Sequence, residues 1–193
     1  MIADLIKANR TCRRFDEQHR ITPATLLELI DLARLSASAG NLQPLKYILS
    51  CAPATNAKIF ECLKWAYYLK DWPGPEPGER PAAYLVMMND TRISKALDCD
   101  HGIAAQSILL GAREKGLAGC MLAAVNRPKL SIVLNIPKPL EIKLVLAIGK
   151  PKETIVIDTL GAEGDIRYWR DDDLTHHVPK RRLEDIVVAS YEI

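Results

Sequence analysis

The sequence has no long run of apolar residues, and this absence removes membrane-spanning proteins from consideration. A transmembrane helix needs about 20 consecutive apolar residues, and none of the 193 residues begins such a stretch. The N-terminus, MIADLIKANR, carries an acidic residue at position 4 and no extended apolar core, unlike a secretory signal peptide. We therefore expect a cytoplasmic protein that does not associate with a membrane.

Closely spaced cysteine pairs are also missing. The five cysteines are scattered, odd in number and never arranged as C-x-x-C. This pattern argues against a disulfide framework and against a zinc ribbon, because both need paired or closely spaced thiols. It is typical of a protein from a reducing compartment.

The chain lacks an excess of charge and lacks the common nucleotide motifs. Its formal net charge is only +2, so no general field draws it to nucleic acid or to an acidic membrane. Neither a G-x-G-x-x-G turn nor a phosphate-binding P-loop is present, which leaves a dinucleotide Rossmann site and a nucleoside triphosphatase without support. The hydrophobic share of 48% is ordinary for a globular protein, and the length suits one domain spanning residues 1–193.

What is present is an alternation of helical and strand patterns. Apolar spacing, Pro and Gly predict helices over residues 2–9, 22–40, 54–69, 98–115 and 128–134. Strands are expected at 45–51, 82–88, 119–124 and 140–149. The Pro/Gly-rich segment 71–78 is expected to be a loop, and the residues after 150 are interpreted as a polar tail. Strands separated by helices predict an α/β or α+β sandwich.

The most distinctive stretch is basic and lies near the N-terminus, with the sequence NRTCRRF at 9–15. Arginine side chains bind phosphate oxygens two at a time, and the Thr11 hydroxyl adds a donor among them. One interpretation is a grip on the phosphate of a cofactor. The alternatives are a solvated basic face and a nucleic-acid contact, and the near-neutral net charge argues against the second of these.

Four segments, in order, resemble those of the nitroreductase family of FMN enzymes. They are NRTCRRF at 9–15, SASAGNLQP at 36–44, EKGLAGCML at 114–122 and PKRRLEDIV at 179–187. The resemblance covers nearly the whole chain and implies an α+β fold, with a central mixed sheet flanked by helices, in an intertwined homodimer. It also implies an FMN-dependent oxidoreductase that takes hydride from NADH or NADPH and reduces a nitroaromatic, a quinone or a similar small acceptor.

The same resemblance assigns flavin contacts by position. Phosphate and ribityl contacts fall on Arg10 and Thr11, the pyrimidine edge falls on Arg13, and the rest of the phosphate cradle falls on Lys180 and Arg182. The loop that would reach the flavin of the other subunit contains Ala37, Ser38, Ala39 and Asn41. The turn near flavin N5 contains Met121, Leu122 and Ala123. Asn9 and Ala37 depart from the family's usual arginine and proline.

No catalytic side chain and no metal ligand are expected, because in such an enzyme the flavin carries the electron chemistry. Arg13 suits its position, since a permanent cation stabilises the negative charge that a reduced flavin gathers at its pyrimidine edge. Trp72, in the Pro/Gly-rich loop, has two interpretations: it stacks on the substrate, or it packs in the core or a lid.

Three other groups carry side chains that are capable of chemistry. The segment 98–101 (DCDH) has ligand-type side chains, but acids are also favoured at the start of a helix. His176 and His177 are interpreted as part of a solvated tail. Cys12 lies among arginines that favour a thiolate, although its position tolerates many residues in the family.

The sequence is also compatible with a second function. The chain is compact and lacks the arginine at position 9, which is compatible with an FMN-binding sensor or partner protein without general reductase activity.

Overall fold

In the computed structural model, residues 1–96 and 99–192 are described, and the chain divides into two compact units. The first unit comprises Met1–Trp65 and Pro73–Lys152, and the second comprises Ala66–Trp72 and Glu153–Ile193. A single domain over 1–193 stays a prediction. Among the described residues, no helix has both the length and the apolar character needed to cross a membrane.

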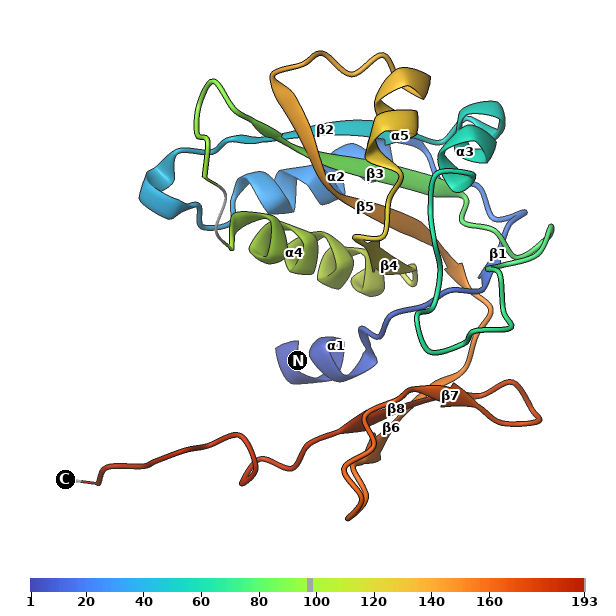
Figure 1. The fold of residues 1–193 in the computed structure, drawn as a ribbon, viewed down its shortest axis with the longest axis vertical. Helices are drawn as coiled ribbons and strands as arrows, with labels where there is room; N and C mark the ends of the chain where they lie inside the picture. The colour runs from blue at the N-terminus through green and yellow to red at the C-terminus, as the bar shows by residue number, and fades with distance from the viewer. Residues whose placement is uncertain (97–98, 193) are drawn as a thin grey trace. The chain divides into compact units, whose positions relative to one another are not determined.

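The first unit is built on an antiparallel sheet with the strand order β1-β5-β3-β2, in which β4 also pairs with β5 (Figure 1). Its strands are β1 (Phe15–Asp16), β2 (Leu45–Ser50), β3 (Ala83–Asp90), β4 (Ala118–Leu122) and β5 (Leu140–Pro151). Its helices are α1 (Ile2–Ala8), α2 (Pro23–Arg34), α3 (Pro53–Phe60), α4 (Asp100–Glu114) and α5 (Arg127–Val133). This arrangement confirms the predicted α+β class.

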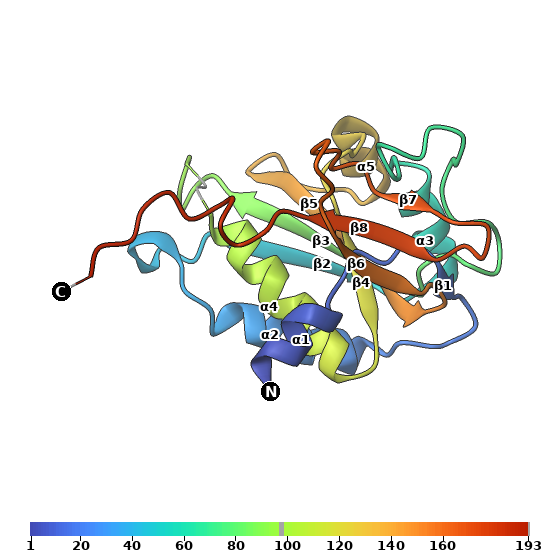
Figure 2. The same cartoon turned by 90° about the horizontal axis from the view of Figure 1, so that it is seen from below.

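The main core lies between the sheet and the helices α2 and α4, which run side by side (Figures 1 and 2). Leu29 of α2, Ile108 of α4 and Leu85 of β3 are fully buried there. Helices α3 and α5 cover the opposite face, where Ile59 and Leu130 are fully buried. Because β3 is buried on both faces, it is apolar at successive positions rather than at alternate ones, as its sequence predicted.

Gly119 in β4 occupies a point where no side chain fits. An ideal Cβ there would come within 2.6 Å of a Leu109 methyl carbon and 2.7 Å of the Ala147 carbonyl oxygen. That carbonyl belongs to the central strand β5 and has no freedom to move aside. We therefore expect Gly119→Ala to lower the free energy of unfolding by about 1–3 kcal/mol, the usual cost of overpacking.

Urea denaturation measures this effect, and Gly102 in α4 provides the matched control. A Cβ at Gly102 would meet no atom of the described residues within 4 Å, so Gly102→Ala should leave the stability unchanged or raise it slightly. Equal stability of the Gly119→Ala and Gly102→Ala proteins would show that the sheet yields at Gly119.

Two helix ends differ from the sequence predictions. Helix α3 ends at Phe60 rather than near 69, because the following residues pair with a distant segment: the Lys64 amide donates to the Ala124 carbonyl at 2.9 Å, and the Asn126 amide donates to the Cys62 carbonyl at 2.8 Å. Helix α2 ends at Arg34, before the predicted breaker Gly40. The predicted helix 98–115 includes Asp98, which lies outside the described residues.

The segment after 150 is not an unstructured polar tail, and that prediction was wrong. It forms a second sheet with the order β6-β8-β7, composed of β6 (Ile155–Thr159), β7 (Trp169–Arg170) and β8 (His176–Lys180). Strands β6 and β8 are parallel, whereas β7 and β8 are antiparallel. Polar and aromatic pairs hold it together, so the hydrophobic pattern alone did not reveal it.

Candidate functional site

The basic stretch 9–15 lies beside strand β4. The Cys12 amide donates to the Gly119 carbonyl at 3.0 Å, and Thr11 forms a parallel bridge with Gly119. The Phe15 amide then donates to the Glu79 carbonyl at 3.0 Å as the chain enters β1. Two of the four segments that carry the family resemblance therefore meet within the first unit.

The Arg10 guanidinium, next to the bridge between Thr11 and β4, has hydrogen-bond donors that could bind a ligand. One terminal nitrogen of its guanidinium donates to the Ile6 carbonyl at 2.7 Å. Its Nε is buried and has no hydrogen-bond partner within the described part of the chain. A buried N–H without an acceptor is costly, and the oxygens of a bound anion would satisfy it. With the exposed Thr11 next to it, Arg10 fits a phosphate group.

The neighbouring arginines have different roles. Arg13 is buried. Arg14 makes two hydrogen bonds to the Glu79 carboxylate, at 2.6 and 2.7 Å, and Lys152 lies 3.4 Å from the same carboxylate. These contacts hold the pKa of Glu79 below its ordinary value, mainly through the hydrogen bonds from Arg14. Arg14 is therefore committed to a structural ion pair and is not free to bind a ligand.

The predicted N5 turn lies at the end of β4. Met121 is partly exposed, Leu122 is buried, and Ala123 is exposed just beyond the strand. The backbone passes on to Val125, which bridges to Leu63. The turn is thus continuous with the strand that carries Gly119, the partner of Thr11.

The predicted cross-subunit loop is fixed at the beginning of α4. The Ser38 hydroxyl donates to Asp100 Oδ2 at 2.5 Å, and the Ala39 amide donates to Asp100 Oδ1 at 3.0 Å. Ala37 and Asn41 are exposed on either side of this anchor.

Within one chain, this loop and the stretch 10–13 lie at opposite ends of α4 (Figure 1). The helix has 15 residues and so spans about 22 Å at 1.5 Å per residue. The two groups therefore do not converge on one ligand within the first unit.

Asp100 is the residue of this region whose role the sequence did not reveal. It is 3% exposed, and both carboxylate oxygens accept a hydrogen bond from the loop. The metal-site alternative at 98–101 includes Asp98, which lies outside the described residues. Among the residues that are described, no group of three His, Cys, Asp or Glu side chains could hold a metal ion. Because Asp100 and Ser38 are 62 positions apart, no local pattern signals their contact.

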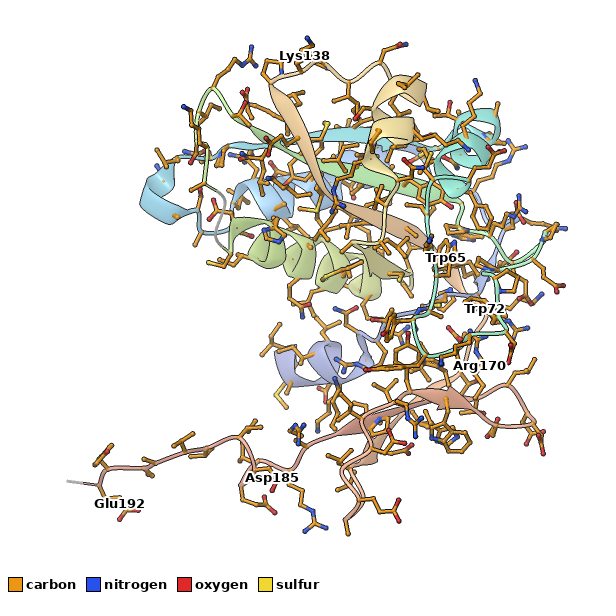
Figure 3. All side chains as sticks on the ribbon, in the orientation of Figure 1. Trp65, Trp72, Lys138, Arg170, Asp185 and Glu192 are labelled. Atoms are coloured by element: carbon orange, nitrogen blue, oxygen red, sulfur yellow. The ribbon has the colours of Figure 1, made fainter. Side chains whose placement is uncertain are left out.

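Three predicted residues belong to the second unit. The guanidinium of Arg170 lies 4.3 Å from the ring centroid of Trp72, and it also donates to the buried Glu153 at 2.5 Å (Figure 3). The packing interpretation of Trp72 thus has a specific partner. Lys180 ends β8, Arg182 lies two residues beyond it, and both are exposed.

The histidine pair in this unit is ordered rather than solvated. His176 is 1% exposed. The His177 ring stacks on Trp169 at 4.1 Å between centroids, and its nitrogens lie 2.9 Å from Asp158 and 3.3 Å from Asp171. Burial lowers the pKa of His177, but hydrogen bonds to the two carboxylates and their charges outweigh it, so the pKa is raised overall.

The contacts of His177 with Asp158 and Asp171, here called the His177 clamp, make the stability of the second sheet pH-dependent. A raised pKa in the folded state means that the stabilisation is fully present below the ordinary histidine pKa of 6.5 and is lost as the pH rises through the folded value. We expect slower amide hydrogen exchange in β8 at pH 6 than at pH 8, after correction for intrinsic rates. The difference should disappear in His177→Gln, and a difference of equal size in that variant would contradict the clamp.

The comparisons with known proteins agree with this geometry. A family model described as the nitroreductase family matches residues 6–150. Comparison with curated protein sequences gives no match. Two solved structures with similar folds are a nitroreductase family protein from Clostridium novyi NT and an FMN-dependent nitroreductase from Clostridium difficile R20291. The first is 24% identical, covers 79% of this chain and 87% of its own, and has a TM-score of 0.64. The second is 19% identical, covers 79% of this chain and 88% of its own, and has a TM-score of 0.66.

A third structure, nitroreductase A from Vibrio parahaemolyticus, is 20% identical with a TM-score of 0.63 and covers 83% of this chain and 72% of its own. At these identities the likeness shows the fold. The family match itself covers well over half of the chain and includes three of the four segments that carry the resemblance, those at 9–15, 36–44 and 114–122, whereas the segment 179–187 lies beyond it. This protein belongs to the nitroreductase family.

Proposed function

We propose that the protein is an FMN-dependent oxidoreductase that accepts hydride from NADH or NADPH and reduces a small acceptor such as a nitroaromatic or a quinone. The observation that carries the proposal is the buried Nε of Arg10 beside strand β4, which has no hydrogen-bond partner among residues 1–96 and 99–192. Membership of a family that uses FMN supports it. A structural neighbour from Clostridium acetobutylicum that is named as a candidate NADH oxidase supports the choice of donor.

The chain's own residues would bind and orient the cofactor. Arg10 and Thr11 would donate to its phosphate, and Arg13 would hold a permanent positive charge near the pyrimidine edge. The end of β4, at 121–123, would present backbone groups to the ring. When bound, FMN supplies the hydride and electron chemistry, so no side chain has to act as an acid, a base or a nucleophile. The roles of Lys180 and Arg182 in the phosphate cradle, and of Trp72 in stacking, stay predictions.

We also propose that the active form is a homodimer. The loop 37–41 is anchored to Asp100 at one end of α4, whereas Thr11 is paired with Gly119 beyond the other end. This separation supports the expectation that the loop serves the flavin of a second subunit. Analytical ultracentrifugation of the flavin-loaded protein tests the dimer directly, and a monomer that retains full activity would contradict it.

Steady-state kinetics tests the proposed reaction. We expect parallel lines in double-reciprocal plots when NADH or NADPH is varied at several concentrations of menadione or nitrofurazone. Parallel lines are the ping-pong pattern, and they arise because the oxidised nucleotide leaves before the acceptor binds. Protein that binds FMN but oxidises neither nucleotide would favour the alternative function, a flavin-binding sensor or partner protein.

A further inference from the structure

The first unit contains a cavity of about 1000 Å³ where strand β2 ends and helices α2 and α3 begin. Its lining residues include Leu49, Phe60, Pro81 and Tyr84. None of the residues that the family resemblance assigns to the flavin lines it. Its size is within the range of small-molecule sites, so the polar groups that face it decide what it could bind.

Tyr84 is the first of these groups. Its side chain is 1% exposed, and its hydroxyl is buried with no hydrogen-bond partner in the part of the chain that the structure describes. Buried hydroxyl groups normally have a partner. Burial also raises the pKa of Tyr84, so the hydroxyl keeps its proton. It can therefore donate a hydrogen bond to an acceptor on a ligand.

Arg80 is the second donor. Its Nε is buried without a partner, and no ion pair to it is found among the described residues. Its guanidinium lies 4.2 Å from the centroid of the Phe60 ring, which holds it against the apolar wall. The acid that lines the same cavity, Glu17, instead accepts hydrogen bonds from the Gly78 and Arg80 amides at 2.5 and 3.4 Å. In the part of the chain that the structure describes, the positive charge of Arg80 is thus left without a paired anion.

The start of helix α3 adds to the positive potential. Its N-cap is Ala52, which provides no side-chain hydrogen bond to the first turn, and Pro53 follows it. Helix α2, at the same cavity, is capped by the Thr22 side chain, which accepts from the Thr25 amide. An uncapped helix N-terminus carries partial positive charge and free amides. It therefore adds positive potential on the side of the cavity that Ala52 and Pro53 form.

We propose that this cavity binds a small organic carboxylate, separately from the flavin. The Tyr84 hydroxyl and the Arg80 guanidinium would each donate to the carboxylate, whose two oxygens match two donors. The apolar body of the ligand would lie against Leu49, Phe60 and Pro81. A free inorganic anion would leave that apolar wall uncovered, and a neutral molecule would leave Arg80 without a counter-charge.

Isothermal titration calorimetry of the flavin-loaded protein tests the proposal with cyclohexanecarboxylate as the probe. Cyclohexylmethanol is the neutral analogue, and inorganic phosphate is the anion without an apolar body. We expect binding of the carboxylate and much weaker binding of the other two. Tyr84→Phe removes a single hydroxyl and should weaken carboxylate binding about tenfold, since a hydrogen bond to a charged group is lost. Arg80→Gln should weaken it at least as much.

The matched control is Arg34→Gln, which removes an exposed arginine of α2 that pairs only with Asp31 among the described residues. This variant should bind the probe like the wild type. Unchanged binding in Tyr84→Phe would overturn the proposal, and so would equal binding of cyclohexylmethanol or of phosphate. The flavin absorbance per chain is measured in the same samples. It should be equal in all variants, so loss of the carboxylate site is distinguished from failure of the proposed flavin function.

Discussion

Replacing Arg10 by glutamine should lower the affinity for FMN by about 10- to 100-fold. The guanidinium has a buried Nε with no partner among the described residues, and we assign it to the cofactor phosphate. Hydrogen bonds to a charged group contribute about 1.5–3 kcal/mol, and each 1.4 kcal/mol corresponds to a tenfold change in affinity. Glutamine keeps a donor near the position of the arginine Nε, but its side chain is shorter and it loses the charge and the planar fork.

Fluorescence titration of the apoprotein with FMN measures this loss. Arg167→Gln is the control, because Arg167 is exposed and forms a surface pair with Asp165, and such pairs contribute little. Riboflavin, which lacks the phosphate, provides a second comparison. Its affinity should be nearly the same in the wild type and in Arg10→Gln, because the lost contact is with the phosphate. An equal loss for FMN and riboflavin would contradict the phosphate assignment.

Replacing Asp100 by alanine should lower the free energy of unfolding by about 3 kcal/mol or more. The buried carboxylate accepts from the Ser38 hydroxyl at 2.5 Å and from the Ala39 amide at 3.0 Å. Each hydrogen bond to a charged acceptor contributes about 1.5–3 kcal/mol. Alanine removes both acceptors and leaves the loop 37–41 without its anchor. Because we propose that this loop serves the flavin of a second subunit, FMN affinity should fall as well.

Asparagine at position 100 tests whether the loss of stability and the loss of FMN affinity have the same cause. Asp100→Asn keeps one oxygen for the Ala39 amide and offers its amide group to the Ser38 hydroxyl, so it should recover much of the stability. It should also recover FMN binding if the position of the loop is what matters. Urea denaturation and FMN titration of both variants provide the measurements. Full FMN affinity in a folded Asp100→Ala protein would show that the loop does not take part in the site.

The parts of the fold that the sequence predicted well are those in which local pattern and burial agree. Strand β3 is apolar at successive positions because both of its faces are covered. Helix α2 begins where Thr22 and Pro23 predicted, since the Thr22 side chain caps the helix. In both elements the information lies within the residues that form them.

The parts that were missed depend on residues far away in the chain. Helix α3 stops at Phe60 because the next residues bond to the segment 124–126, a competition that no window of sequence contains. The second sheet is stabilised by polar pairs such as Arg170 with Glu153 and His177 with Asp158. A polar composition looks the same in a solvated tail as in such a sheet until the partners are known.

In the candidate site, too, some features could be predicted from the sequence and others depend on residues far apart in the chain. The family resemblance drew attention to Arg10, Thr11 and the end of β4, and the structure brings the stretch 10–12 beside β4. The resemblance gave Arg14 no role, and the structural role of Arg14 was not visible in the sequence because its partner Glu79 lies 65 positions away. For the same reason, the contact of Asp100 with the loop was visible only in three dimensions.

The absorbance spectrum of the purified protein, followed by anaerobic addition of NADH and then NADPH, tests the proposed function most directly. We predict a flavin spectrum, either as purified or after FMN is added, that is bleached by at least one of the two nucleotides. A bound flavin that stays oxidised with both nucleotides would contradict the reductase. A colourless protein that takes up no FMN would contradict the assignment of Arg10 and its neighbours to a cofactor.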